Sequence, residues 1–231
     1  MAFAKPSDVA WTPLQCGPAL VNDVIGFGGN FYAIDSCGDI RVYDFEGAHL
    51  KTVSLPVKNV DNEVAETSMY LVELGGQIHV VQRKMYDFEI FGLPVRRTWT
   101  FVGYWVDVCN EKWEEVKSLG DWCIFIGSDH SFSISASDYP ECLRNCIYFT
   151  DDYSGLYYST TTYSRYGMGA YDLDDPMIHI LLHEDISHFK FSLPVWIKSS
   201  FCLTPFQNLL QIQKHDGAAL QILAGTTKLS V

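Results

Sequence analysis

Two adjacent acidic residues, Asp151 and Asp152, are the first candidates for chemistry in this sequence. Paired carboxylates flank the bond that is cleaved in glycoside hydrolysis, one as an acid and the other as a nucleophile or base. Neighbouring residues on a strand point to opposite faces, so this pair could meet one substrate only beyond the end of a strand. Because Asp is also a frequent turn residue, we interpret the pair as the start of a loop and predict no catalytic residue there.

Three histidines, His179, His183 and His188, lie close together in the sequence. Histidines four residues apart suit zinc on a helix. The sequence around His179 is instead typical of a strand, where residues four apart share a face but lie roughly 13 Å from each other. Cys142 and Cys146 have the same spacing, and buried or surface thiols are the ordinary state of such cysteines. The sequence therefore predicts no metal site and no cofactor site.

The glycine-rich stretch from Gly26 to Gly29 resembles a phosphate-binding loop. Such a loop needs a helix directly after it, because the helix N-terminus supplies the backbone amides and a favourable dipole. No helix signal follows Gly29, so we expect a turn between two strands. No Ser/His/Asp or Cys/His set has enough context to be named, and the chain is expected not to be an enzyme.

The elements that carry these residues are predicted to be short strands. Aromatic and β-branched runs alternate with Gly-containing turns, which is a hairpin signal. The pattern recurs three times, and each copy ends in an apolar strand closed by an acidic residue, at Asp44, Asp107 and Asp172. A loop is expected over 87–97. The expected strands are 23–27, 31–35, 40–44, 69–73, 77–81, 100–107, 113–116, 123–127, 131–135, 146–149 and 169–173.

This recurrence favours an all-β fold, a partial kelch-like β-propeller with about three to four blades of antiparallel strands. The three closing acids are spaced more widely than the roughly 40 to 50 residues of a plain blade. Polar insertions at 59–67 and 151–167 would account for the excess. A β-sandwich is the alternative that periodicity alone leaves open. No helix longer than about three turns is expected before residue 197.

Composition limits the classes of partner. The chain has 231 residues, 48% of them apolar and 19% charged, which fits an ordinary globular domain. Its formal net charge of −12 would repel a phosphate backbone or an anionic membrane. The seven cysteines are scattered, without a CxxC pair, and no apolar run is long enough to span a bilayer. We therefore expect a cytoplasmic or nuclear protein with no nucleic-acid or membrane partner.

Several blocks of this sequence resemble a known family. The most specific are Leu-Gly-Asp at 119–121 and Asn-Cys-Ile-Tyr-Phe-Thr-Asp-Asp at 145–152. Together with the others they resemble the KIB-type, kelch-like propeller of plant F-box proteins, also called domain of unknown function 295. The other matching blocks are 2–8, 11–12, 29–35 with Gly38, 70–73 with Gly76, 113–116 and 194–196.

The resemblance implies a domain organisation and a role. Residues 1–197 would form the propeller region, and 198–231 a divergent, weakly ordered C-terminal tail. Members of this family present substrates to a cullin ubiquitin ligase, and their F-box docks on the Skp adaptor. No F-box is recognisable in this sequence, so binding to the Skp adaptor is not expected of this chain alone.

Three functional hypotheses follow from these observations. The first is a protein-binding domain that resembles the substrate-recognition part of an F-box protein. The second is a propeller hydrolase that uses loop carboxylates, and the third is a truncated product with little function of its own. Strand edges with few charges, as around Val24 and Phe31, are expected to promote self-association. Trp113 and Trp196 are expected to be buried, structural residues.

Overall fold

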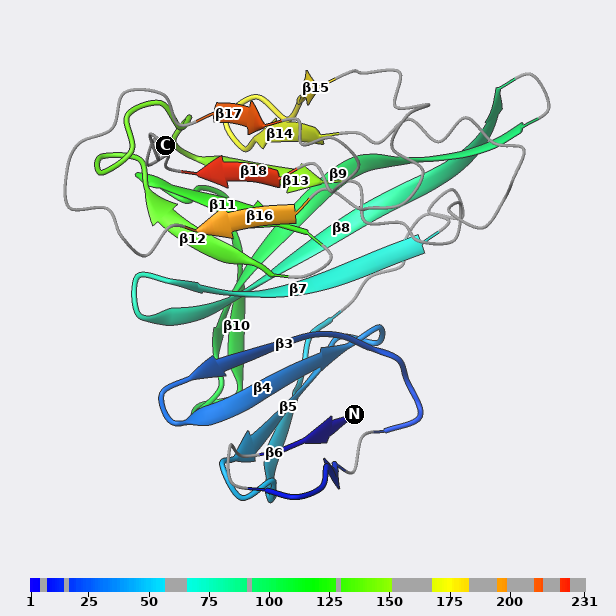
Figure 1. The fold of residues 1–231 in the computed structure, drawn as a ribbon, viewed down its shortest axis with the longest axis vertical. Helices are drawn as coiled ribbons and strands as arrows, with labels where there is room; N and C mark the ends of the chain where they lie inside the picture. Colours follow the sequence, from blue (N-terminus) through cyan, green and yellow to red (C-terminus); the bar gives the residue numbers. More distant parts are fainter. Residues whose placement is uncertain are drawn as a thin grey trace, which may run out of the picture. The chain divides into compact units, whose positions relative to one another are not determined.

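The computed structural model describes ten ranges of the chain, and every regular element in them is a β-strand (Figure 1). This agrees with the expected all-β fold. The chain divides into two compact units, the first made of Met1–Phe88 with Arg96–Val116 and the second of Glu89–Val95 with Lys117–Val231. The described ranges are 1–4, 8–14, 17–56, 66–90, 93–127, 130–150, 168–182, 195–198, 210–213 and 221–224.

The first sheet of unit 1 is an antiparallel meander of consecutive strands, in the order β3-β4-β5-β6. The strands agree closely with the hairpin pattern of the sequence. Gly28 and Gly29 form the turn between β3 and β4, both with positive φ, which confirms that this glycine stretch is a turn. The bounds are β3 Val21–Phe27, β4 Asn30–Asp35, β5 Asp39–Asp44 and β6 His49–Ser54.

The second sheet of unit 1 is also a meander, in the order β10-β9-β8-β7. Its two central strands extend through most of the segment expected to be a loop, so the prediction for 87–97 is wrong. Residues 87–90 alternate polar and apolar side chains in the sequence, and this period of two is typical of a strand. The bounds are β7 Glu66–Leu74, β8 Gln77–Ile90, β9 Leu93–Asp107 and β10 Lys112–Val116.

The two sheets of unit 1 share one apolar core, which includes Ile34, Val42, Leu71 and Val80. Polar contacts join the sheets at both edges. On one side, Asp23 Oδ2 on β3 accepts a hydrogen bond of 2.8 Å from the backbone N–H of Leu71 on β7. The first strand of one sheet therefore lies beside the first strand of the next, as in neighbouring propeller blades.

Lys51 on β6 makes the contact at the opposite edge of these sheets. Its Nζ donates to the carbonyl oxygens of Val108, at 2.9 Å, and Cys109, at 3.1 Å, in the turn between β9 and β10. The same ammonium lies 3.4 Å from Glu111. The two meanders are therefore joined between β3 and β7 and also between β6 and the β9–β10 turn.

Unit 2 contains a mixed sheet in the order β12-β11-β13-β14-β15. All neighbours in it are antiparallel except β11 and β13, which run parallel. The expectation of purely antiparallel blades is therefore wrong at this pair, because the β12 hairpin returns the chain before β13 begins. The bounds are β11 Trp122–Ile126, β12 Phe132–Ser135, β13 Cys146–Thr150, β14 Met168–Asp172 and β15 Ile178–Leu182.

A second sheet in unit 2 has the order β16-β18-β17, with β16 and β18 parallel. Two of its strands lie beyond residue 197, where we placed the domain boundary. The bounds are β16 Val195–Lys198, β17 Leu210–Gln213 and β18 Gln221–Ala224. Most of the remaining residues between 198 and 231 lie outside the described ranges, so the boundary stays a prediction.

Aromatic rings fill the core of unit 2. Phe125 stacks between Phe132 and Tyr148, with ring centroids 5.1 Å and 4.7 Å away. Trp196 meets Phe125 edge-on at 5.0 Å, and its indole N–H donates to the carbonyl of Ile126 at 2.8 Å. Only 3% of Trp196 is exposed, which confirms its expected structural role.

Trp113 does not have the burial that we expected. It is 38% exposed and lies on β10, an edge strand whose residues from Lys112 to Glu115 all face solvent in part. Its ring meets Tyr104 edge-on at a centroid distance of 6.2 Å. An edge strand has a neighbouring strand on one side only, so a large side chain on it stays partly in contact with water.

Candidate functional site

The candidates for chemistry in the sequence do not converge on one site in the structure. Asp151 and Asp152 lie outside the described residues, as do His183 and His188. His179 is exposed on β15. Within the described ranges, no group of three or more His, Cys, Asp or Glu side chains is placed to hold a metal ion.

Asn145, the first residue of one recognised sequence block, has a structural role. It takes a left-handed φ of 59° and is almost fully buried. Its Oδ1 accepts hydrogen bonds from the backbone N–H of Leu119, at 2.7 Å, and from Ser118 Oγ, at 3.2 Å. Its own N–H donates to the carbonyl of Trp122 at 2.9 Å. The Asn block therefore locks the Leu-Gly-Asp turn onto the start of β13, which is a structural role.

Asp121, the acid of the Leu-Gly-Asp block, is a second structural residue. Its Oδ2 accepts hydrogen bonds from Ser135 Oγ at 2.7 Å and from the backbone N–H of Ser137 at 3.2 Å. These bonds favour the ionised form and lower the pKa of the carboxyl. Asp121 thus fastens the end of β12 beside the start of β11. It is a turn acid, with no sign of a catalytic role.

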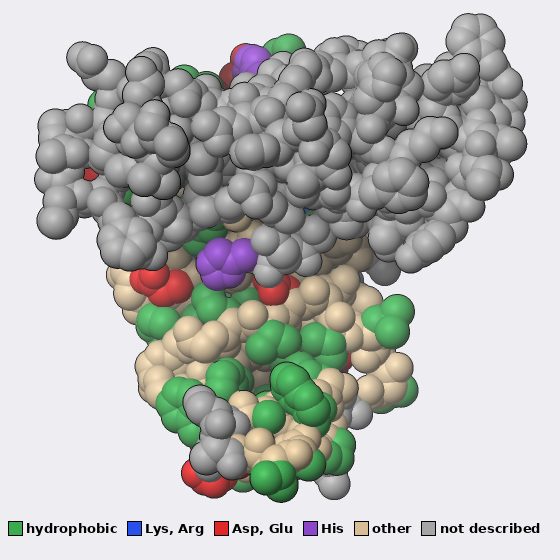
Figure 2. Space-filling view, viewed as in Figure 1, with side chains coloured by type: hydrophobic (Ala, Val, Ile, Leu, Met, Phe, Trp, Pro, Cys, Tyr) green, Lys and Arg blue, Asp and Glu red, His purple; other side chains and the backbone are tan. Residues whose placement is uncertain are grey.

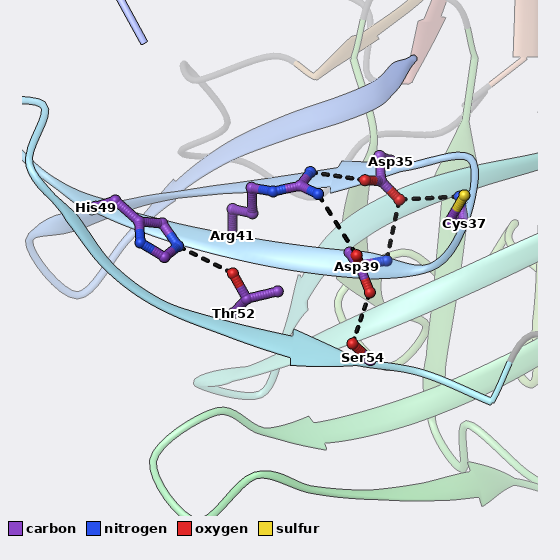
Figure 3. Close-up of polar contacts among 7 residues, drawn as sticks. All are labelled: Asp35, Cys37, Asp39, Arg41, His49, Thr52 and Ser54. Atoms are coloured by element: carbon purple, nitrogen blue, oxygen red, sulfur yellow. Dashed lines mark hydrogen bonds and ion pairs between the residues drawn. The ribbon is translucent and has the colours of Figure 1, made fainter. Parts of the chain in front are cut away.

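The densest polar network among the described residues lies at the β4–β5 turn (Figure 3). The Asp35 carboxylate is completely buried, and its Oδ2 accepts from Arg41 Nη1 at 2.6 Å. Its Oδ1 accepts from the backbone N–H groups of Cys37, at 2.9 Å, and Asp39, at 3.1 Å. Ser54 Oγ donates to Asp39 Oδ1 at 2.6 Å and so joins β6 to this turn.

The electrostatics of this network also indicate a structural role. Burial alone would lower the pKa of Arg41, but the hydrogen bond and the charge of Asp35 outweigh it, and the net shift is upward. The Asp35 carboxylate accepts hydrogen bonds from one guanidinium and two backbone amides. Asp35 and Arg41 therefore hold a blade turn together.

Two polar side chains on β8 are buried in a way that the sequence did not suggest. His79 is only 7% exposed, and burial lowers its pKa although Gln77 and Glu73 oppose the shift. Arg83 is also buried, and its Nε donates to Thr98 Oγ1 at 2.8 Å. The alternation of β8 places both side chains on the same face of the sheet but does not tell whether that face is buried. No local signal distinguishes a solvent-facing from a buried polar residue at such positions.

Among the described residues, the most exposed large apolar side chains lie before β3. Val9 is 104% exposed, Trp11 is 72% exposed and Leu20 is 79% exposed. We call these three the N-terminal apolar residues. Figure 2 shows hydrophobic side chains over the part of unit 1 that carries β1 to β6. The three lie within twelve positions of the sequence, and exposed apolar side chains that gather in one patch mark protein contact surfaces.

A small hairpin anchors this segment. β1 (Ala2–Phe3) pairs with β2 (Thr12–Pro13), and Leu14 N–H donates to the carbonyl of Met1 at 3.0 Å. The ring of Phe3 packs directly over Gly47 in the β5–β6 turn, where any Cβ would clash with it. The hairpin is therefore fixed to the blade by Phe3, whereas Trp11 extends into solvent.

Comparison with known proteins identifies the family. The family model described as the KIB1-4 beta-propeller matches residues 1–172. This chain belongs to that family. The match confirms the resemblance deduced from the sequence blocks, and it agrees with the strands of units 1 and 2 as parts of a propeller. No solved structure matches this chain.

Relatives of this KIB1-4 beta-propeller chain are F-box proteins of Arabidopsis thaliana. F-box protein SKIP23 is 32% identical over 158 residues, which cover 64% of this chain and 39% of that protein. F-box protein At4g35733 is 31% identical, with coverage of 64% and 42%. The putative F-box/kelch-repeat protein At5g24040 is 24% identical and covers 87% of this chain and 52% of its own length. The chain thus spans about two fifths of the first two relatives.

Proposed function

We propose that this chain is a protein-binding β-propeller region that recognises a substrate for ubiquitination, as part of an F-box type of receptor. The proposal rests on the family and on one observation, the exposure of Val9, Trp11 and Leu20. Removing large apolar side chains from water drives most protein association, and tryptophan is common at the centre of such contacts.

The role proposed is binding without catalysis. The side-chain oxygens of Asp35, Asp121 and Asn145 accept hydrogen bonds that hold turns together. The hydrolase alternative depends on Asp151 and Asp152, and no observation on the described residues favours it. The net charge of −12 favours a protein partner over nucleic acid or an anionic membrane. The cytoplasm or nucleus is the compartment that we propose. Among the described residues, the structure contains no helix that is long and apolar enough to cross a bilayer.

Affinity purification from plant cell extract tests this proposal. The bait is the chain itself, compared with a triple variant, Val9→Ser, Trp11→Ser and Leu20→Ser. A double variant, Leu143→Ser and Met177→Ser, is the matched control, because these side chains are also exposed but lie in unit 2. We expect proteins retained by the parent and the control to be lost from the triple variant. Equal retention by all three baits would contradict the proposed surface.

A further inference from the structure

The β1–β2 hairpin is a sheet of only two strands, whereas every other sheet among the described residues has three to five. β2 pairs with one edge of β1, and no strand of the described ranges pairs with the other edge. An isolated two-stranded hairpin is at best marginally stable in water. Here Phe3 and Leu14 pack over Gly47 and hold the hairpin against the β5–β6 turn. The open edge of β1 is therefore presented on a fixed support.

The backbone of β1 directs three polar groups toward this open edge. Leu14 N–H donates to the carbonyl of Met1 at 3.0 Å, so these two residues form a hydrogen-bonded pair of the hairpin. In an antiparallel pair, residues bonded to the partner strand alternate with residues whose N–H and C=O point away from it. The bonding toward β2 returns at Phe3, so the N–H and C=O of Ala2 and the N–H of Ala4 point away from β2. We call these three groups the β1 edge.

The side chains beside the β1 edge leave room for a further strand. Phe3 faces Gly47, so its neighbours Ala2 and Ala4 lie on the opposite face of the hairpin, and both are exposed. One step along the register, Trp11 lies opposite Ala4 on this outer face and is 72% exposed. Alanine side chains are too small to cover the indole. A large apolar side chain on an added strand would lie beside Ala4 and reach Trp11.

Other edge strands of unit 1 carry groups that hinder the addition of a strand. Charged side chains and proline have this effect at the edge of a sheet. Four of these edge strands have such a residue: Pro13 on β2, Lys51 on β6, Glu73 on β7 and Glu114 on β10. Residues 1–4, which contain β1, include neither a charged side chain nor a proline. β1 therefore lacks the protection that these four edges have.

We propose that the β1 edge binds an extended segment of the partner protein, which adds a third strand to the β1–β2 sheet. This inference rests on the proposed function, because it describes how the partner of the N-terminal apolar residues is held. In strand addition, main-chain hydrogen bonds supply affinity and alternate side chains supply specificity. The segment therefore has no proline at the positions that face β1, and it places a large apolar side chain beside Trp11.

Peptide selection tests the β1 edge without a known natural partner. The probe is a displayed library of linear peptides of random sequence, and the bait is the full chain, tagged at its C-terminus. Ala4→Pro is the comparison bait, because it removes an N–H that points away from β2 and no bond of the hairpin. Ala4→Ser keeps this N–H and is the matched control. We expect peptides with alternating apolar residues to be enriched on the parent and on Ala4→Ser, and not on Ala4→Pro.

A selected peptide is then synthesised and measured on the parent chain, which needs no variant to fold. It should slow hydrogen exchange at the Ala4 N–H, and methylation of its own backbone nitrogens that face β1 should weaken binding at least about tenfold. Equal enrichment on the parent and on Ala4→Pro, including none on either, would overturn the inference. So would an Ala4 N–H that stays unprotected with peptide bound, or one that a second copy of the chain already protects without peptide.

The strand addition and the proposed function can fail separately. Natural proteins that are lost from the triple variant at Val9, Trp11 and Leu20 but retained by Ala4→Pro would leave the proposed function standing and remove the strand addition. Natural proteins that the triple variant retains as well as the parent does would contradict the proposed function itself, whichever peptides the library yields.

Discussion

Individual polar residues fix the turns of this protein. Asn145 and Asp121 together hold the chain where β11, β12 and β13 meet, and Asp35 does the same at the β4–β5 turn. The sequence blocks that contain Asn145 and Asp121 could be recognised, but their roles could not be assigned. The bond from Leu119 to Asn145 spans 26 positions, and a contact at that separation leaves no local pattern.

Replacing Asn145 should therefore cost stability rather than function. Asn145→Ala leaves the Leu119 N–H without its acceptor and puts at a left-handed φ a residue that tolerates this conformation less well than Asn, so we expect a loss of about 1 to 3 kcal/mol in the free energy of unfolding. Asn145→Gly keeps the backbone conformation without the acceptor, and Asn145→Asp keeps an acceptor. Urea unfolding measures all three. An Asp variant no more stable than the Ala variant would show that the Oδ1 contacts are unimportant.

His79 should make stability depend on pH. Its pKa in the folded protein lies below the ordinary value of 6.5, so between the two values the unfolded chain binds more protons. Stability is therefore highest above about pH 6.5 and falls as the pH is lowered through that value. Urea midpoints at about pH 7.5 and about pH 5.5 measure the effect.

The control for this pH effect is a second histidine. His79→Gln should reduce the difference between the two midpoints, and His130→Gln, at an exposed position, controls for the loss of one histidine. A midpoint difference that is the same in the parent and in His79→Gln would contradict the assignment to His79.

At the scale of the elements, the strands of units 1 and 2 follow the sequence closely, because runs of aromatic and β-branched residues between glycine turns are a local signal. Two features were not predictable in this way. The extension of β8 and β9 into 87–97 was not predicted, although polar and apolar residues continue to alternate through 87–90. The parallel pairing of β11 with β13 depends on which strand lies beside which, and periodicity carries no such information.

Trp196 and Trp113 test the difference between a core and an edge position. Trp196→Ala removes a buried ring and its bond to Ile126, so we expect a loss of about 3 to 5 kcal/mol. Trp113→Ala removes mainly the edge-on contact with Tyr104, worth about 1 kcal/mol. Thermal unfolding of both variants measures the ranking. A Trp113 variant as unstable as the Trp196 variant would contradict the exposure seen on β10.

At the scale of the whole molecule, the family and the fold class could be predicted, and the binding surface could not. Trp11 belonged to a recognised block, but its exposure results from the way Phe3 anchors the hairpin over Gly47. That contact joins residues far apart in the chain. The sequence therefore indicated that a protein partner is expected without indicating where it binds.

Self-association is a separate expectation at this scale. The edge strand β3 carries an exposed Val24, whereas the edge strand β10 carries Lys112, Glu114 and Glu115, whose charges discourage strand pairing. We expect the isolated chain to form dimers or larger species at micromolar concentration and Val24→Lys to reduce them. Size-exclusion chromatography with light scattering measures this. A parent protein that is monomeric throughout would contradict the expectation.

Photo-crosslinking from position 11 tests the central claim most directly. A photoreactive amino acid replaces Trp11 in one sample and Leu143 in another, and both are irradiated in plant cell extract. The proposed function predicts a defined heterologous protein crosslinked from position 11, absent from position 143 and competed by unlabelled parent protein. Crosslinks of equal yield from both positions, or crosslinks from position 11 only to another copy of this chain, would contradict it.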